Sequence, residues 1–214
     1  MHSRRIVLFC FVLTLVVSQA YADGAVGFYG GLNNASLSGD TPPSTSYGGK
    51  TGLVLGVMGE FRIAKDVMLG LHPMYIQKGA TPTVKPLTDD GDPIENDLSM
   101  DYISVPVLVK IESGNGVTYV TGGLDLAFLM DASLTTPNDE RDVKDLLQDI
   151  DLSMVFGFGA KIPLGAPLLT LEFRYAQSLL NVADMQVGQE DLPVRFRSSG
   201  FQLLAGLIFP LGTR

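Results

Sequence analysis

Cysteine, histidine and basic residues are all scarce in this chain of 214 residues, and each scarcity excludes a class of protein. The single cysteine, Cys10, precludes an intramolecular disulfide, and no cysteine–histidine spacing typical of a metal site occurs. The histidines are His2 and His72 alone. The 15 Lys and Arg residues are outnumbered by 23 Asp and Glu residues and form no basic stripe, which excludes nucleic acid as a partner.

Long apolar runs are scarce as well. A run at residues 6–17 follows two arginines and leads to an Ala-Tyr-Ala sequence that ends at Ala22, which matches a secretory signal peptide. A membrane anchor is the weaker alternative, because spanning takes roughly 20 apolar residues. We therefore expect residues 1–22 to be a signal peptide and residues 23–214 to be the mature domain. Without the two arginines of the leader, the mature net charge is 13 − 23 = −10.

Strand patterns dominate the mature domain. Residues 103–111 alternate between aliphatic and other side chains, and a Gly-Asn-Gly turn follows before a second strand begins. Such period-two alternation gives each strand one apolar face. Eight segments show this pattern or a strand-rich composition: 25–32, 51–63, 67–80, 99–113, 117–130, 151–162, 168–178 and 199–211.

The links between these segments alternate in length without exception. Long links fall at 33–50, 81–98, 131–150 and 179–198, and short ones at 64–66, 114–116 and 163–167. Outer-membrane barrels have short periplasmic turns, long extracellular loops and strands of about 9–11 residues. The sequence therefore predicts an all-β fold, an eight-stranded antiparallel up-and-down transmembrane β-barrel. A soluble secreted sandwich would show the same alternation, and it is disfavoured by strand length and by the link pattern.

Charged residues decide which strand face meets lipid. In residues 168–178 one face carries Glu172 and Arg174, and an arginine facing lipid at the midplane costs about 2–4 kcal/mol. That face must therefore point into the lumen. The same rule turns outward an apolar set that includes Leu55, Val107 and Phe156. The expected lumen network comprises six charged residues: Glu60, Arg62, Lys110, Lys161, Glu172 and Arg174.

The expected network has a functional consequence. Eight strands enclose a space just wide enough for side chains to fill, and unpaired charges there would lose their solvation. We therefore expect Glu60 and Glu172 to bridge the four cations and to block the passage.

Two positions disturb the strand pattern. Pro106 lacks an N–H in the middle of a strand, which predicts a bulge or a missing ladder bond. With Tyr119 facing outward, Asp125 would face lipid too. We therefore expect a bulge at Gly122-Gly123 that turns Asp125 inward.

Several strands resemble a known family, the PorT-like outer-membrane β-barrels of Gram-negative bacteria. The resemblance is carried by four stretches: GLHPMYIQKGA (70–80), DYISVPVLVKI (101–111), YVTGGLDLAFLM (119–130) and LEFRYAQSLLNV (171–182). It implies an eight-stranded barrel in the outer membrane, inserted by the outer-membrane assembly machinery. It implies little about activity, because the fold does not fix function. Phe209 resembles the terminal aromatic residue that this machinery reads, although Pro-Leu-Gly-Thr-Arg follows it.

Candidate chemistry is sparse. His72 stands where the family has a polar residue, often Gln, and a lone strand histidine predicts a packed or hydrogen-bonded lumen residue rather than a catalytic base. The acidic run at 89–97 lacks the residue order of a calcium loop, which favours a solvated loop. Residues 139–149 have helix-like apolar spacing and predict a short helix. We expect no enzyme activity, no cofactor and no metal.

Two function classes remain. The first is a structural or interaction barrel in the cell outer membrane, among its lipids, whose acidic outer loops contact a ligand or a protein partner. The second is a porin-like barrel that transports small solutes, or an accessory of secretion or assembly. The two classes differ in conductance.

Overall fold

The computed structural model describes residues 24–39, 45–84, 94–137, 139–181, 183–186 and 193–211. The expected signal peptide at 1–22 and most of the acidic run at 89–97 lie outside these ranges. No helix within them is long and apolar enough to cross a membrane.

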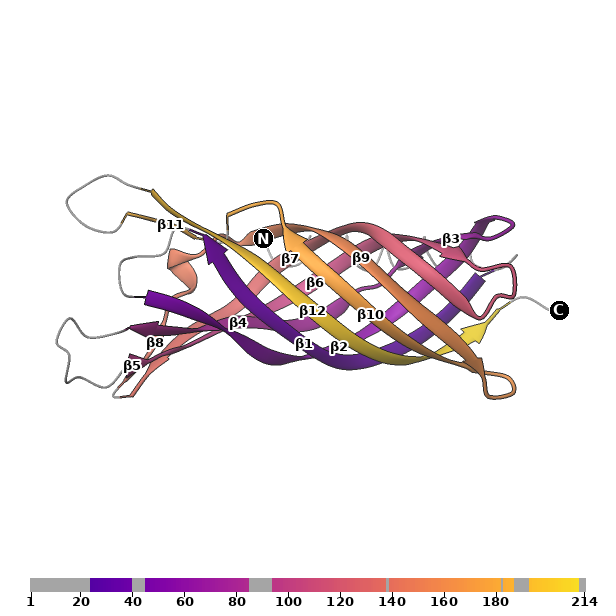
Figure 1. Cartoon of the computed structure of the whole chain (residues 1–214), viewed down its shortest axis with the longest axis horizontal. Coiled ribbons are helices and arrows are strands. Elements are labelled where there is room, and N and C mark those ends of the chain that lie inside the picture. Colours follow the sequence, from indigo (N-terminus) through magenta and orange to yellow (C-terminus); the bar gives the residue numbers. More distant parts are fainter. Residues whose placement is uncertain are drawn as a thin grey trace, which may run out of the picture.

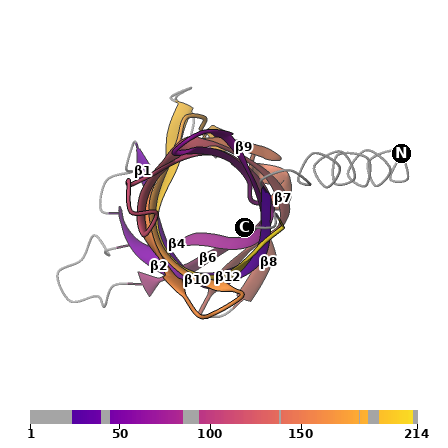
Figure 2. The ribbon, with the colours of Figure 1, turned by 90° about the vertical axis from the view of Figure 1, so that its right-hand side faces the viewer.

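The described chain is almost entirely antiparallel β-strand, and it closes into a ring of eight hydrogen-bonded strand positions (Figures 1 and 2). The ring takes the strands in chain order: β1 (Gly24–Gly39), β2 (Thr45–Ala64), β3 (Val67–Leu71) with β4 (Met74–Val84), β6 (Asp97–Glu112), β7 (Thr118–Thr136), β9 (Ile150–Pro163), β10 (Leu168–Ser178) and β12 (Pro193–Pro210). β12 pairs with β1 and closes the ring. The predicted eight-stranded antiparallel barrel is confirmed.

The strands are strongly staggered around the ring. The stagger can be measured by following pairing partners from strand to strand around the barrel. The path starts at Tyr119 on β7 and comes back to β7 at Leu129. In between it passes one residue on each of the other seven strand positions: Gly159, Glu172, Leu204, Gly31, Val54, Ile76 and Tyr102. The stagger is therefore 129 − 119 = 10 residues for eight positions, or ten-eighths of a residue for each step. Such a stagger goes with the steep strand tilt in Figure 1 and with an interior that side chains can fill.

The two ends of the barrel differ. At the short-turn end, strands are joined by residues 65–66, 113–117 and 164–167. Gly116 and Gly165 have positive φ there, a conformation that glycine adopts without strain. At the opposite, long-hairpin end, on the left in Figure 1, the links add short elements: β5 (Ile94–Glu95), β8 (Asp139–Asp142), the 3-10 helix η1 (Lys144–Leu146) and β11 (Ala183–Gln186).

The strands run further into the long links than the sequence predicted. β1 continues to Gly39 and β2 begins at Thr45, both inside the link predicted at 33–50, and β7 continues to Thr136. Beyond lipid, the outward strand face meets water and carries polar residues, so the apolar alternation weakens before the strand ends.

The helix predicted at 139–149 is wrong. β8 occupies its first four residues and only the single turn of η1 follows. The apolar spacing that suggested a helix has a different origin. Leu147 is buried with the inner core, whereas Leu146 is exposed.

An apolar belt surrounds the barrel. Exposed apolar side chains occur around the ring and include the predicted outward residues Leu55, Val107 and Phe156. Soluble monomers rarely expose a continuous apolar surface of this extent, so the belt is the lipid-facing surface. Toward the long hairpins it ends at a ring of outward polar residues: Asn34, Thr51, Gln77, Asp101, Asp131, Gln177 and Ser199.

Two tyrosines mark this edge of the belt. Gln77 Nε2 donates to the Tyr75 hydroxyl on β4 at 3.1 Å, and the Tyr175 hydroxyl on β10 donates to Gln177 Oε1 at 2.7 Å. β4 and β10 lie four positions apart in the ring of eight, on opposite sides of the barrel. Tyrosine favours membrane interfaces because it joins an apolar ring to a polar hydroxyl. The two pairs therefore mark the level of the lipid boundary.

We expect a tryptophan at either position to report a shallow depth. The chain contains no tryptophan, so Tyr75→Trp and Tyr175→Trp each carry a single tryptophan. In bilayers of brominated lipids, both variants should be quenched most by bromine near the headgroups. Phe158→Trp, placed deeper in the belt, should be quenched most by bromine far down the acyl chains. Equal depths for the three variants would contradict this boundary.

β7 keeps its register where a bulge was predicted. Its pairing with β6 and β9 runs without a shift through Gly122 and Gly123, so that prediction is wrong. Tyr119 and Asp125 both point inward, because they share one face of an unbroken strand. The register between β6 and β7 shifts nearer the long hairpins, where Met130 is the extra residue.

One strand position is interrupted beside a proline of the neighbouring strand. His72 and Pro73 separate β3 from β4, opposite Pro106 of β6. The pairing with β6 keeps one register on both sides of this break, so Pro106 gives a missing ladder bond and not a bulge. The remaining backbone groups stay bonded, since His72 N donates to Pro106 O and Val57 N donates to Pro73 O, both at 3.0 Å.

Candidate functional site

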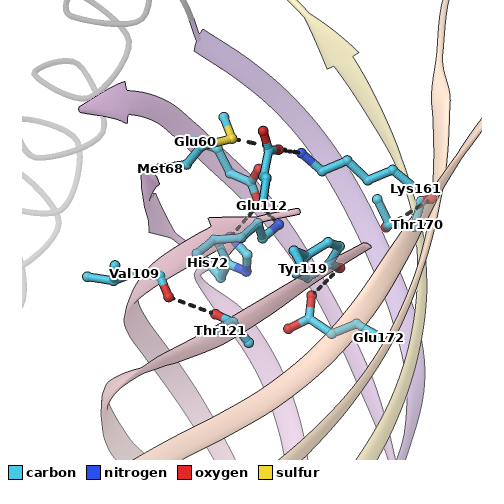
Figure 3. Close-up of polar contacts among 12 residues, drawn as sticks. Glu60, Met68, His72, Val109, Glu112, Tyr119, Thr121, Lys161, Thr170 and Glu172 are labelled. Atoms are coloured by element: carbon cyan, nitrogen blue, oxygen red, sulfur yellow. Dashed lines mark hydrogen bonds and ion pairs between the residues drawn. The ribbon is translucent and has the colours of Figure 1, made fainter. Parts of the chain in front are cut away.

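The candidate site is a group of polar side chains inside the barrel, toward the short-turn end. Five of the six predicted lumen residues are buried there, while Arg62 lies at the rim with 34% of its side chain exposed. Figure 3 shows part of the group, with Lys161 extending toward Glu112 and Tyr119 pointing at Glu172. We call it the short-turn network: Glu60, Arg62, His72, Lys110, Glu112, Tyr119, Lys161, Glu172 and Arg174.

Two ion pairs lie at the centre of the network. Lys110 Nζ contacts Glu60 Oε1, and Arg174 Nε donates to Glu172 Oε1 at 2.5 Å. All four side chains are almost completely buried. Each charge therefore depends on its partner, because bulk water does not reach it.

Glu112 is a third carboxylate, which the sequence analysis omitted. It accepts from Lys161 Nζ and, through Oε2, from Arg62 Nη2 at 3.2 Å. The prediction that Glu60 and Glu172 bridge all four cations is thus wrong for Arg62 and Lys161. Glu112 lies two residues after Lys110 and therefore on the same strand face, so its inward position could have been predicted from the sequence.

His72 joins the two central ion pairs. Arg174 Nη2 lies 2.8 Å from His72 Nδ1, and a guanidinium can only donate, so Nδ1 is the acceptor. The imidazole proton is then on Nε2, which lies 3.2 Å from Glu60 Oε1. Tyr29 on β1 adds a further bond by donating its hydroxyl to the His72 carbonyl at 2.9 Å.

Tyr119 closes the network into a loop. Its hydroxyl donates to Glu172 Oε2 at 2.8 Å, and Lys110 Nζ lies 4.2 Å from the centre of its ring, within cation–π range. The contacts thus return to their start after six residues: Glu60, His72, Arg174, Glu172, Tyr119 and Lys110. These residues come from β2, the β3–β4 junction, β6, β7 and β10, so the loop crosses the lumen.

Inward glycines make room for these side chains. A Cβ on Gly159 would lie 2.5 Å from the Tyr119 ring, and one on Gly70 would lie 2.7 Å from the His72 ring. A Cβ on Gly157 would lie 3.0 Å from Arg174 Cγ. Glycines on the same or neighbouring strands, which have no side chain, thus leave the space that the bulky network residues occupy.

Filling one of these spaces should destabilise the barrel. Gly159→Ala is expected to lower the free energy of unfolding by about 1–3 kcal/mol, because the Tyr119 ring must move away from Glu172. Urea titration in lipid vesicles measures this change. Gly122→Ala is the matched control, since the nearest atom to its Cβ lies 3.6 Å away. Equal losses in the two variants would contradict a specific role for Gly159.

A second polar cluster lies nearer the long hairpins. Asp151 accepts from Lys78 Nζ at 2.8 Å, from Ser178 Oγ at 2.5 Å and from Ser153 Oγ at 3.4 Å. The sequence analysis did not include Lys78 and Asp151 in the lumen network, because they stand near the ends of predicted segments. Each is nevertheless an even number of residues from the inward residues of its own strand, so its inward direction could have been predicted. The buried inner residues at this end are largely apolar: Leu37, Ala80, Met100, Leu129, Ala132, Leu147 and Phe196.

Neither cluster is arranged as a metal site. Among the residues that the structure describes, no group of three His, Cys, Asp or Glu side chains is placed to hold a metal ion. The carboxylates of the two clusters, Glu60, Glu112, Glu172 and Asp151, each have a Lys or Arg nitrogen within 4 Å. The arrangement favours mutual neutralisation of charge inside a narrow barrel.

Comparison with known proteins agrees with this geometry. The family model described as "Outer membrane protein beta-barrel domain" matches residues 18–184. The chain belongs to this family. Membership places it in the outer membrane. No curated protein matches the chain.

Several solved structures are similar to the chain at low sequence identity. Outer membrane protein AlkL, determined in DMPC lipid bilayers by solid-state NMR, is 12% identical with a TM-score of 0.51, over 90% of this chain and 91% of that chain. Neisserial surface protein A is 15% identical with a TM-score of 0.48, over 86% and 97%. OprG from Pseudomonas aeruginosa is 16% identical with a TM-score of 0.47, over 91% and 99%. At 12% identity the likeness to AlkL is one of fold alone.

Proposed function

We propose that this outer-membrane barrel is a closed, non-catalytic interaction barrel, which holds its long hairpins beyond the membrane for a partner. The observation that carries the proposal is the six-residue loop of contacts across the lumen. A passage for solutes would require these buried ion pairs to separate. Separating them is costly, because each member would be left as an uncompensated buried charge.

The long-hairpin end supplies the surface for a partner. Among the residues described at this end, the exposed charges are predominantly acidic: Asp97, Asp131, Asp139, Glu140, Asp142, Asp145 and Asp149, against Arg141 and Arg197. Like charges on one surface favour a partner of the opposite sign and speed its encounter at low salt. We therefore assign to these hairpins a ligand or protein with a basic surface.

His72 supports the absence of catalysis. Its Nδ1 accepts from Arg174 and its Nε2 lies 3.2 Å from Glu60 Oε1, so both ring nitrogens point at residues of the short-turn network. A general base must reach a substrate proton, and His72 is 1% exposed. Its position favours a structural role in the network.

The finer assignment to PorT-like barrels is part of the proposal. The two motifs that suggested it, at 70–80 and 101–111, lie on adjacent ring positions, and His72 N donates to Pro106 O between them. A paired motif of this kind supports a common origin with that group. Recognition by the outer-membrane assembly machinery follows from the same proposal.

Conductance tests the closed lumen. The purified barrel in a planar bilayer should show no large, steady conductance at neutral pH, because side chains and their ion pairs fill its narrow interior. A variant that removes the loop, Tyr119→Ala with Lys110→Ala, should conduct more frequently if it inserts. A wide and stable channel in the unaltered protein would contradict the proposal and favour the porin-like alternative.

A further inference from the structure

Asp125 is the exception among the inner carboxylates. Of the charged residues that the structure describes inside the lumen, Glu60, Glu112, Asp151 and Glu172 each lie within 4 Å of a Lys or Arg nitrogen. Asp125 is 1% exposed and has the Ser104 hydroxyl as its hydrogen-bond donor, at Oδ1. Its Oδ2 has no partner.

Two further buried polar atoms also lack partners. Gln202 Oε1 on β12 is an acceptor without a donor, and Arg174 Nη1 on β10 is a donor without an acceptor. Both side chains are at least 98% buried, and the two residues are register partners on adjacent strands. The other unpartnered atoms, Glu60 Oε2 and His72 Nε2, belong to side chains that lie 3.2 Å apart.

The strand stagger places Asp125 level with Gln202. The paired row from Gln202 passes Arg174 and Gly157 and reaches β7 at Thr121, three steps away. Because of the stagger, a row of paired residues rises toward the long hairpins by ten-eighths of a residue at each step from β7 to β9, β10 and β12. Over these three steps it rises by about four residues, measured along a strand. Asp125 lies four residues beyond Thr121. The unpartnered atoms on β7, β10 and β12 therefore face one section of the narrow lumen.

We propose that Asp125, Arg174 and Gln202 form a binding site for one internal water molecule. Water donates two hydrogen bonds and accepts others, which matches two unpartnered acceptors and one unpartnered donor. Buried waters typically make about three such bonds to groups that the protein leaves unsatisfied. This water joins the Ser104–Asp125 pair to Arg174 and so extends the short-turn network toward the long hairpins.

The site goes beyond the proposed function, because it concerns what the closed lumen binds. A small monovalent cation is the competing occupant, since it would also satisfy Asp125 Oδ2 and Gln202 Oε1. Arg174 Nη1 decides against a cation, because a guanidinium donor faces the same section of lumen.

A high-resolution crystal structure of the full barrel tests the site. We expect one density peak within about 2.7–3.2 Å of Asp125 Oδ2, Gln202 Oε1 and Arg174 Nη1. No anomalous peak should appear there after a thallium(I) soak. A thallium peak would overturn the proposal in favour of a cation. Absent density, or direct contact between the Asp125 and Gln202 side chains, would also overturn it.

Two variants of Asp125 separate the occupants further. Asp125→Asn keeps an acceptor oxygen and removes the charge, so the peak should remain. Asp125→Leu removes the acceptor, so the peak should be lost. Gln177→Leu, on the outward face at the edge of the belt, is the control and should leave the peak unchanged. Loss of the peak in Asp125→Asn would indicate that the occupant requires the negative charge, and would contradict water.

Discussion

Val107→Arg is expected to lower the free energy of unfolding by about 2–4 kcal/mol, measured by urea titration in lipid vesicles. Val107 faces outward at 47% exposure and stands in the middle of the apolar face of β6, which extends from residue 103 to residue 111. The guanidinium would lie near the bilayer midplane, where neither water nor a counter-charge reaches it.

The matched control is on the same strand and the same face. Asp101 already lies in the ring of polar residues that ends the belt, so Asp101→Arg should cost about 0–1 kcal/mol. The contrast between the two variants measures depth, because strand, face and introduced side chain are shared. Similar losses at the two positions would show that the apolar face of β6 does not meet lipid.

Glu172→Gln is expected to be still more damaging, with a loss of about 3–5 kcal/mol in the same assay. The substitution keeps the shape of the side chain but removes the charge that Arg174 Nε contacts at 2.5 Å. Arg174 is 1% exposed, so its charge would be left buried without an opposite charge beside it. The Tyr119 hydroxyl can still donate to the amide oxygen, so the loss reports mainly the ion pair.

The double variant distinguishes an ion pair from two independent contacts. Arg174→Met in the Glu172→Gln background removes the stranded charge while it keeps much of the apolar stem. The double variant should therefore lose less stability than the two single variants added together. Additive losses would mean that Glu172 and Arg174 do not interact in the membrane-embedded barrel.

The outward and inward faces could be predicted because lipid tolerates charge so poorly. Arg174 and Lys161 were directed inward from their own strands alone, without knowledge of a partner. Tyr119 was wrongly predicted to face outward, because it carries no charge that would exclude it from lipid. The inward position of Asp125 was correct, but the sequence analysis moved it there with a bulge, whereas one unbroken face carries both residues.

The partners inside the lumen could not be predicted in the same way. Lys161 on β9 contacts Glu112 on β6, and Arg174 on β10 contacts His72 at the β3–β4 junction. Such pairs depend on the stagger of the closed ring, which a list of separate strands does not specify. The length of the strands toward the long hairpins was underestimated. Backbone hydrogen bonds hold these extensions together, and such bonds do not require an alternating apolar pattern in the sequence.

The distribution of the network over the ring also constrains the order of assembly. Glu60 on β2 and Arg174 on β10 are joined through His72, and between these strands the ring closes by pairing β1 with β12. An unclosed sheet inserting into the membrane would hold these charges apart, each still in need of water. Pairing of β1 with β12 therefore also brings these charges together and removes most of the water around them, so closure of the ring and filling of its interior depend on each other.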